Sequence, residues 1–255
     1  MRSRSTAWFS CGGADARIQP PAPRIIRAVT GLDLGAVDWF PLWLSLRVAA
    51  IATVLSLAIG LASAYALAHG RFRGRDLLES LLTLPIVLPP TVLGYYLLVL
   101  LGRSSPLGEI YESVFGGPLV FTWQAAVVAA CFHAVPLLVR AARAAFESVD
   151  ANLENAARSL GASEWRVFRR VSLPLARRSI AAAAVFAFAR SLGDFGVTIM
   201  IAGNIPGRTQ TMSVAIYDAV QSGDALLANA LAAVMLALAL SVLWFIKTAG
   251  TERAY

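Results

Sequence analysis

Two ionisable residues of opposite charge stand four positions apart within an apolar run. Arg190 and Asp194 are one helical turn apart, with Gly193 between them. An arginine can attract an oxyanion through its paired N–H donors, but an aspartate one turn away would cancel much of that attraction. Ionisable groups inside apolar segments need a partner or water. The spacing therefore favours a buried structural pair over a direct anion ligand, and leaves both interpretations open.

A second set of notable residues lies in the arginine-rich stretch ENAARSLGASEWRVFRRVSLP, residues 154–174. Apolar residues recur there at the spacing of one helical face: Leu153, Ala156, Ala157 and Leu160. Asp150 can cap the start of this helix, and Gly161 can end it in a left-handed turn. Ser163 can then begin a second short helix, which Pro174 should not allow to continue. The pattern predicts a helix, a sharp turn and a second helix, serving as an interfacial element or as a docking surface.

Motifs for covalent or metal chemistry are absent from the sequence. There is no G-x-x-x-x-G-K-[ST] stretch, and the one lysine is Lys247, so an ATP site of that kind must belong to another polypeptide. No G-x-S-x-G or H-E-x-x-H stretch occurs either. Cys11, Cys131, His69 and His133 are isolated along the chain, which favours core or interface roles over metal ligation. We expect no catalytic residue, metal site or cofactor in this chain.

The elements that must position these residues are membrane helices. Hydrophobic residues make up 58% of the 255 residues, which is more than a soluble domain usually holds. Five apolar runs are long enough to cross a bilayer: Leu42–Leu67, Leu77–Leu101, Leu119–Val139, Ser179–Ala202 and Ala225–Ile246. The net charge of +7 does not indicate a nucleic-acid partner, because the arginines flank these runs. The sequence predicts an all-α transmembrane protein.

Prolines interrupt the second predicted span. Pro85, Pro89 and Pro90 each remove a backbone donor and disturb the helical ladder. In lipid the freed carbonyls must be satisfied by protein or water, so a broken helix should face the bundle or a cavity. Transporters use interrupted helices to bind and gate their substrates. Pro89 and Pro90 are therefore candidate pathway or gate residues, along with Arg190 and Asp194, although a kink that only shapes packing explains the prolines equally well.

The arginines alternate between loops in a pattern that predicts orientation. The arginine-rich connections contain Arg71, Arg73, Arg75, Arg140, Arg143, Arg158, Arg166, Arg169, Arg170, Arg177 and Arg178. The alternate loops hold only Arg103 and Arg208. The positive-inside tendency places the rich connections in the cytoplasm, and five spans then place the C-terminus there too.

Residues 1–36 do not fit this arrangement. They contain several arginines and the stretch IQPPAP, and they have no apolar run long enough for another span or a secretory signal. We predict that residues 1–36 are disordered or wrongly included, with the biological start near Val37. Residues 37–255 then form the transmembrane domain.

The stretch at residues 154–174 resembles the cytoplasmic signature of bacterial ABC-importer permeases, E-A-A, three residues, G, nine residues, I-x-L-P. The matching positions are Ala156, Ala157, Gly161, Val171, Leu173 and Pro174. Asn155 holds the usual glutamate position and Glu154 sits one residue earlier, which puts a specific role for the acid in doubt. The resemblance implies a type I ABC importer permease fold, in which this loop is a coupling helix that docks on an ATP-hydrolysing subunit. It assigns the coupling role to Asn155, Ala156, Ala157, Gly161, Leu173 and Pro174.

Two further stretches, LPIVLPPTVLGYYLLVLLG (84–102) and FARSLGDFGVTIMIAGNIPG (188–207), are similar to the molybdate permeases, with the sulfate and thiosulfate permeases as close relatives. The resemblance implies a multi-pass protein of the bacterial inner membrane that moves an oxyanion without altering it. It also implies a second copy of the chain, two ATPase subunits that use ATP and Mg²⁺, and an extracytoplasmic oxyanion-binding protein. Molybdate, tungstate and sulfate stay open as substrates. A membrane enzyme and a membrane scaffold or sensor are the competing classes of function.

Overall fold

The computed structural model describes residues 38–70 and 73–251, with side chains as far as residue 244. The described residues form helices and connecting turns, and no strand occurs among them. The elements are α2 (Phe40–His69), α3 (Arg75–Val87), α4 (Pro90–Leu101), α5 (Pro106–Phe115), α6 (Trp123–Glu147), α7 (Ala151–Ser159), α8 (Glu164–Val167), the π-helix η1 (Phe168–Ser172), α9 (Leu173–Leu192), α10 (Gly196–Ile201), α11 (Met212–Gln221) and α12 (Ala225–Thr251). The predicted disordered segment, residues 1–36, lies outside the described residues.

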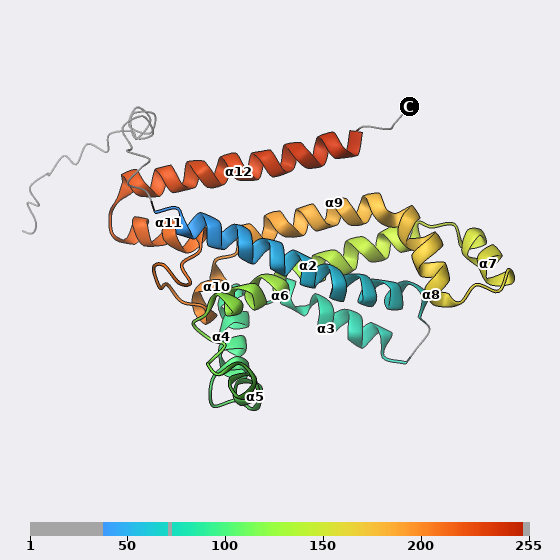
Figure 1. Cartoon of the computed structure of the whole chain (residues 1–255), viewed down its shortest axis with the longest axis horizontal. Helices are drawn as coiled ribbons and strands as arrows, with labels where there is room; N and C mark the ends of the chain where they lie inside the picture. Colours follow the sequence, from blue (N-terminus) through green and yellow to red (C-terminus); the bar gives the residue numbers. More distant parts are fainter. Residues whose placement is uncertain (1–37, 71–72, 252–255) are drawn as a thin grey trace, which may run out of the picture.

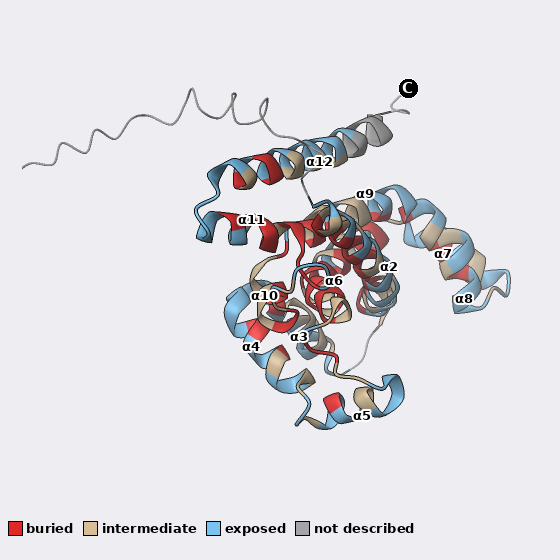
Figure 2. Cartoon of the chain, turned by 60° about the vertical axis from the view of Figure 1, so that its left-hand side comes forward, coloured by how far each residue is buried: buried red, intermediate tan, exposed pale blue. Residues whose placement is uncertain are grey.

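The core lies where α2 and α6 pack along each other (Figure 1). Leu44, Val48 and Ala52 of α2 pack in one apolar cluster with Ala125 and Ala129 of α6. The small alanine side chains allow the two helices to approach closely, as is common between membrane helices. Figure 2 shows buried residues gathered on α2 and α6, whereas α7, α8, α5 and much of α12 are exposed. The outer face of α12 is apolar, as expected for a helix that contacts lipid.

The prediction of about five spans is confirmed, with corrections to two of them. In the described part of the chain, α2, α6, α12 and the continuous helix Glu164–Leu192 are each long and apolar enough to cross a membrane. The second predicted span is the pair α3 and α4, which is bent by 115° and counts as a fifth only as a broken span. The bend lies at Leu88 and Pro89, because the residue before a proline favours an extended backbone. Pro85 lies inside α3 without ending it.

The fourth predicted span, Ser179–Ala202, was wrong at both ends. The helix ends at Leu192, and α10 begins only at Gly196. At the other end, Pro174 does not stop the preceding helix, since α8, η1 and α9 form one span. Proline is tolerated in the first turn of a helix, and the wider π-turn of η1 precedes this one. The observed span, Glu164–Leu192, therefore begins and ends earlier in the sequence than the predicted one.

The break between α3 and α4 and the break between α9 and α10 lie against each other. A Cβ added to Gly196, at the start of α10, would come 2.7 Å from Cβ of Pro90, at the start of α4. One turn further on, a Cβ at Gly94 would lie 2.7 Å from Cβ of Met200. Only glycine allows the backbones to come this close. The interrupted second span and the interrupted fourth span thus meet at a common point beside α6 (Figure 1).

Candidate functional site

The loop between α6 and α9 forms the helix, turn and second helix predicted from its sequence. Asp150 caps α7, its side chain accepting a hydrogen bond of 2.8 Å from the backbone N–H of Asn152. Gly161 has a φ of +81°, and the N–H of Ala162 donates back to the carbonyl of Ala157 across the turn. This is the left-handed helix ending that glycine favours. The two caps fix the path of the chain at either end of α7.

The outer face of this loop is apolar and exposed. Leu153 is 50% exposed, Leu160 is 89% exposed and Trp165, at the start of α8, is 68% exposed. Ala156 is exposed and Ala157 is half-buried on the same face. Leucine and tryptophan side chains grouped in this way are typical of a surface that contacts another protein or the membrane interface. Of the signature residues, Ala156 and Ala157 therefore lie on this outer face, whereas Leu173 packs against the core.

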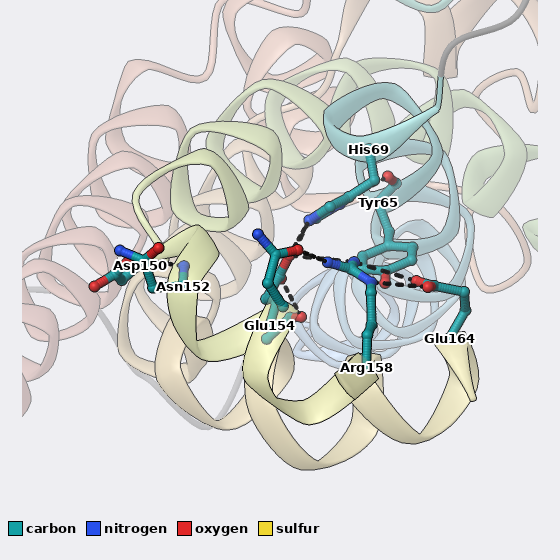
Figure 3. Close-up of polar contacts among 9 residues, drawn as sticks. Tyr65, His69, Asp150, Asn152, Glu154, Arg158 and Glu164 are labelled. Carbon is teal, nitrogen blue, oxygen red and sulfur yellow. Dashed lines mark hydrogen bonds and ion pairs between the residues drawn. The ribbon is translucent and has the colours of Figure 1, made fainter. Parts of the chain in front are cut away.

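The inner face of α7 carries a buried carboxylate. Glu154 is 4% exposed, and the hydroxyl of Ser172 in η1 donates to its Oε1 at 2.6 Å. Nε2 of His69, the last residue of α2, donates to the same carboxylate at 3.0 Å from Oε2 (Figure 3). Arg158, one turn along α7, lies 3.5 Å from Oε2. We call these four residues the Glu154 cluster.

The Glu154 cluster bears on two sequence-based predictions. His69 contacts a carboxylate 85 positions further along the chain, in agreement with the core or interface role predicted for it. The acid whose role was in doubt is the buried one, whereas Asn155, at the usual glutamate position, is exposed and accepts a hydrogen bond of 3.0 Å from Arg158. Leu173 and Pro174, the last signature residues, follow Ser172 directly and begin α9. Glu154 thus lies directly before the first signature position and is not itself one of the signature residues.

Arg158 ties α7 to α8 at the surface of the loop. Its Nε donates to Oε1 of Glu164 at 2.8 Å, and its Nη1 donates to Asn155 (Figure 3). The hydrogen bond with Glu164 raises the pKa of Arg158 above its already high value, with the charges of Glu164 and Glu154 adding to the effect. The guanidinium therefore stays charged, and α7 and α8 are held as one unit around the Gly161 turn.

A second buried carboxylate lies at the break between α9 and α10. Asp194 is 4% exposed, and the hydroxyl of Thr198 donates to its Oδ2 at 2.6 Å. Nδ1 of His133, from α6, lies 2.9 Å from Oδ1. Arg190 is 3.6 Å away and has a side chain that is 37% exposed. We call these four residues the Asp194 cluster.

The Asp194 cluster modifies the predicted Arg190–Asp194 pair. The two residues do approach each other, but Thr198 and His133 make the shorter contacts with the carboxylate. His133, predicted to have a core or interface role, is one of them. Asp194 also lies two residues before Gly196, which packs on Pro90, so the structure brings all four candidate pathway residues to one neighbourhood. Among the described residues, no group of three histidine, cysteine, aspartate or glutamate side chains could hold a metal ion.

The predicted coupling residues and the candidate pathway residues lie toward opposite ends of α9. The Glu154 cluster includes Ser172, immediately before α9, and the Asp194 cluster begins with Arg190 in its last turn. With 20 residues at about 1.5 Å each, α9 separates the two by about 30 Å. The arrangement can transmit a displacement from one end to the other as movement of a single helix.

Comparison with known proteins finds relatives over most of this chain. A family profile described as "Binding-protein-dependent transport system inner membrane component" matches residues 35–249. The molybdenum transport system permease protein ModB of Escherichia coli (strain K12) is 48% identical over 185 residues, which cover 72% of this chain and 81% of that protein. ModB of Azotobacter vinelandii is 38% identical over 223 residues, 88% of this chain and 99% of that protein. The sulfate transport system permease protein CysT of Escherichia coli (strain K12) is 36% identical over 230 residues, 85% of this chain and 83% of that protein.

Solved structures share the fold at low sequence identity. A chain of a bacterial ABC transporter involved in the import of the polysaccharide alginate has a TM-score of 0.68 at 14% identity, covering 91% of this chain and 90% of that chain. A chain of the MetNI methionine ABC transporter, in an inward-facing conformation, has a TM-score of 0.63 at 18% identity, covering 83% of this chain and 96% of that chain. The expected type I ABC importer permease fold is confirmed by these likenesses.

Proposed function

Because the chain belongs to the family of binding-protein-dependent transport system inner membrane components, we propose that it is the permease subunit of an ATP-driven importer whose substrate is molybdate. The observation that favours molybdate is the ranking of two relatives from one organism. Escherichia coli ModB, named for molybdenum transport, is 48% identical, and CysT, named for sulfate transport, is 36% identical. Tungstate and sulfate, which form tetrahedral dianions like molybdate, are the alternative substrates.

The energy for transport comes from partner subunits in this proposal. Two ATPase subunits, which bind ATP and Mg²⁺, dock on the loop formed by α7 and α8. The exposed apolar face at Leu153, Leu160 and Trp165 supports this assignment, because such side chains are buried well by a groove on a partner. Asn155, Ala156 and Gly161 shape this docking element. Leu173 and Pro174 connect it to α9.

The docking loop faces the cytoplasm. The support is the density of arginines at this end of the molecule, including Arg166, Arg169, Arg170, Arg177 and Arg178. The connection between α4 and α6 contains only Arg103, and the connection between α10 and α11 contains only Arg208. The chain is a multi-pass protein of the inner membrane, and this orientation places its C-terminus in the cytoplasm with the docking loop.

The pathway forms between two copies of the chain, and an extracytoplasmic binding protein delivers the anion. The described spans leave much apolar surface exposed, as a subunit of a larger membrane assembly would. Pro89, Pro90, Arg190 and Asp194 belong to a gate at the point where the two interrupted spans meet. ATP binding and hydrolysis bias the assembly between outward-facing and inward-facing states, with the gate following the docking loop through α9.

Uptake by the reconstituted assembly tests this function. Vesicles that contain this chain, its ATPase subunits and a loaded binding protein should accumulate labelled molybdate when ATP is supplied. Sulfate should accumulate more slowly at the same concentration. Faster uptake of sulfate would mean that the chain is a permease whose substrate is sulfate and not molybdate. Binding of the partners with no ATP-dependent uptake of any of the three anions would favour a membrane scaffold or sensor, and activity of the chain alone would favour a membrane enzyme.

A further inference from the structure

Glu154 is buried on a helix that otherwise lies at the surface. Its neighbours Leu153 and Asn155 are exposed, yet Glu154 itself is 4% exposed. A carboxylate in such a place is stabilised only if charged or polar donors satisfy it. Glu154 has them from two elements outside α7: His69 ends α2, and Ser172 ends η1 where α9 begins.

His69 is itself held in place by aromatic contacts. Its ring lies 4.4 Å from the ring of Tyr65, which is 4.7 Å from Phe168 and 5.7 Å from Phe146. Nδ1 of His69 lies 3.4 Å from the carbonyl of Tyr65. Packing of this kind limits the rotamers of the imidazole and directs Nε2 at the carboxylate. The donor is therefore positioned by residues of α2, α6 and η1.

The covalent links of α7 to the spans do not make it rigid. Residues 148–150 connect α7 to α6, and residues 160–163 connect it to α8 around the left-handed Gly161. Such short turns can absorb a change in direction at little cost. The exposed Arg158–Glu164 pair ties α7 across one of these turns to α8, but it does not join α7 to α2. Force applied to the exposed face of α7 would still bend the turns away from α2 unless a buried contact joined α7 to the transmembrane core. The Glu154 cluster is such a contact, on the face of α7 opposite the docking face.

We propose that His69, Glu154 and Ser172 are positioning residues. Their hydrogen bonds form a clamp that holds α7, the helix on which the ATPase docks, to the end of α2 and to the start of α9. This inference rests on the proposed function and concerns how the ATPase subunits move the spans. With the clamp closed, α7 and α9 move together, and displacement of the docking loop reaches the gate. Without the clamp, the ATPase still docks and hydrolyses ATP, but part of the motion is lost in the turns.

The test compares two substitutions of His69 in the complete transporter. His69→Phe keeps a ring to stack on Tyr65 but cannot donate to Glu154, whereas His69→Gln keeps a donor of similar reach. Glu147→Gln is the matched control, since Glu147 makes its ion pair with Arg143 within α6, at the same end of the molecule. The assays are recovery of the permease–ATPase complex, ATP hydrolysis stimulated by the loaded binding protein, and molybdate imported per ATP hydrolysed.

We expect His69→Phe to assemble and to hydrolyse ATP at the wild-type rate, while molybdate imported per ATP falls by about five-fold or more, the size of a typical coupling between sites. His69→Gln and the control should retain the wild-type ratio. The double variant His69→Phe/Glu154→Gln should lose little more than His69→Phe alone, because both changes break one interaction. A wild-type ratio in His69→Phe, or loss of its complex with the ATPase, would overturn the clamp.

A second measurement does not depend on the transported anion. Amide hydrogen exchange over residues 151–159, in the assembled transporter, should be faster in His69→Phe than in the wild type and unchanged in His69→Gln. Equal protection in His69→Phe and the wild type would contradict the proposal. If the wild type imports none of the three anions, the proposed function fails, and hydrogen exchange still decides whether the clamp exists.

Discussion

The Glu154 cluster and the Asp194 cluster have the same composition at opposite ends of α9. Each joins one buried carboxylate to a histidine from a long helix, to a hydroxyl at 2.6 Å and to an arginine one turn away. They differ in their surroundings. The His69 side chain is 25% exposed at the rim of the molecule, and the His133 side chain is 7% exposed beside the break in the fourth span. The comparison indicates that one chemical arrangement can hold a surface helix, α7, in one place and stabilise an interrupted membrane helix in the other.

Removal of the carboxylate should cost most where the donors cannot reach water. Asp194→Ala leaves His133 buried without its carboxylate neighbour and the hydroxyl of Thr198 without its acceptor, and we expect a loss of about 3–5 kcal/mol in the free energy of unfolding. Glu154→Ala should cost less, because water can reach His69 and Arg158. Unfolding of the purified transporter in mixed detergent micelles measures both, with the exposed Asp76→Ala as the control. Equal losses in the two variants would contradict the expectation that the more buried cluster costs more to break.

The hydroxyl groups offer a milder comparison. Ser172→Ala and Thr198→Val each remove one hydrogen bond to a carboxylate, and we expect each to lower the free energy of unfolding by about 1.5–3 kcal/mol. The functional result should differ: Ser172→Ala lowers molybdate imported per ATP, since it loosens the clamp, whereas Thr198→Val leaves the docking end intact. Ser80→Ala, whose hydroxyl donates only to the backbone of its own helix, is the control. If Thr198→Val lowers molybdate imported per ATP and Ser172→Ala does not, the clamp is not at the Glu154 end of α9.

The sequence predicted features set by local rules and missed features made by distant residues. The caps at Asp150 and Gly161 follow from side-chain chemistry within one turn, and they were predicted. The end of α9 at Leu192 was missed, because the apolar run continues through the break and Gly193 was its main local signal. The Glu154 cluster was missed, and the Asp194 cluster was predicted only as the Arg190–Asp194 pair, because the partner histidines are far away in sequence, 85 positions in the case of Glu154. A histidine with no charged neighbour gave no indication of which helix would contact it.

The contact between the two interrupted spans allows a test at the gate. Gly196→Ala would place its Cβ 2.7 Å from Pro90, so α10 must move away from α4 at an expected cost of about 1–3 kcal/mol in the free energy of unfolding. Gly193→Ala is a matched control in the same break, because its Cβ would meet no atom closer than 3.9 Å. We expect Gly196→Ala to slow molybdate uptake and Gly193→Ala to be nearly neutral. Normal uptake by Gly196→Ala would mean that this contact is not part of the gate.

The Gly161 turn tests the docking end with the smallest expected change in stability. Gly161 has a φ of +81° and open space around the position of a Cβ, so Gly161→Val should cost about 1–2 kcal/mol through backbone conformation alone. Gly223→Val has the same conformation and the same open space, outside the docking loop. Both variants should therefore unfold alike.

The two glycine variants should differ in what they do to the assembly. Gly161→Val is expected to redirect α7 relative to α8, which displaces Leu160 and Trp165 from each other and weakens binding of the ATPase subunits. Gly223→Val should bind them normally. Copurification of the ATPase and molybdate uptake measure the difference. Normal docking and import by Gly161→Val would show that the angle between α7 and α8 is not what the ATPase recognises, and would leave the apolar side chains alone as the docking determinant.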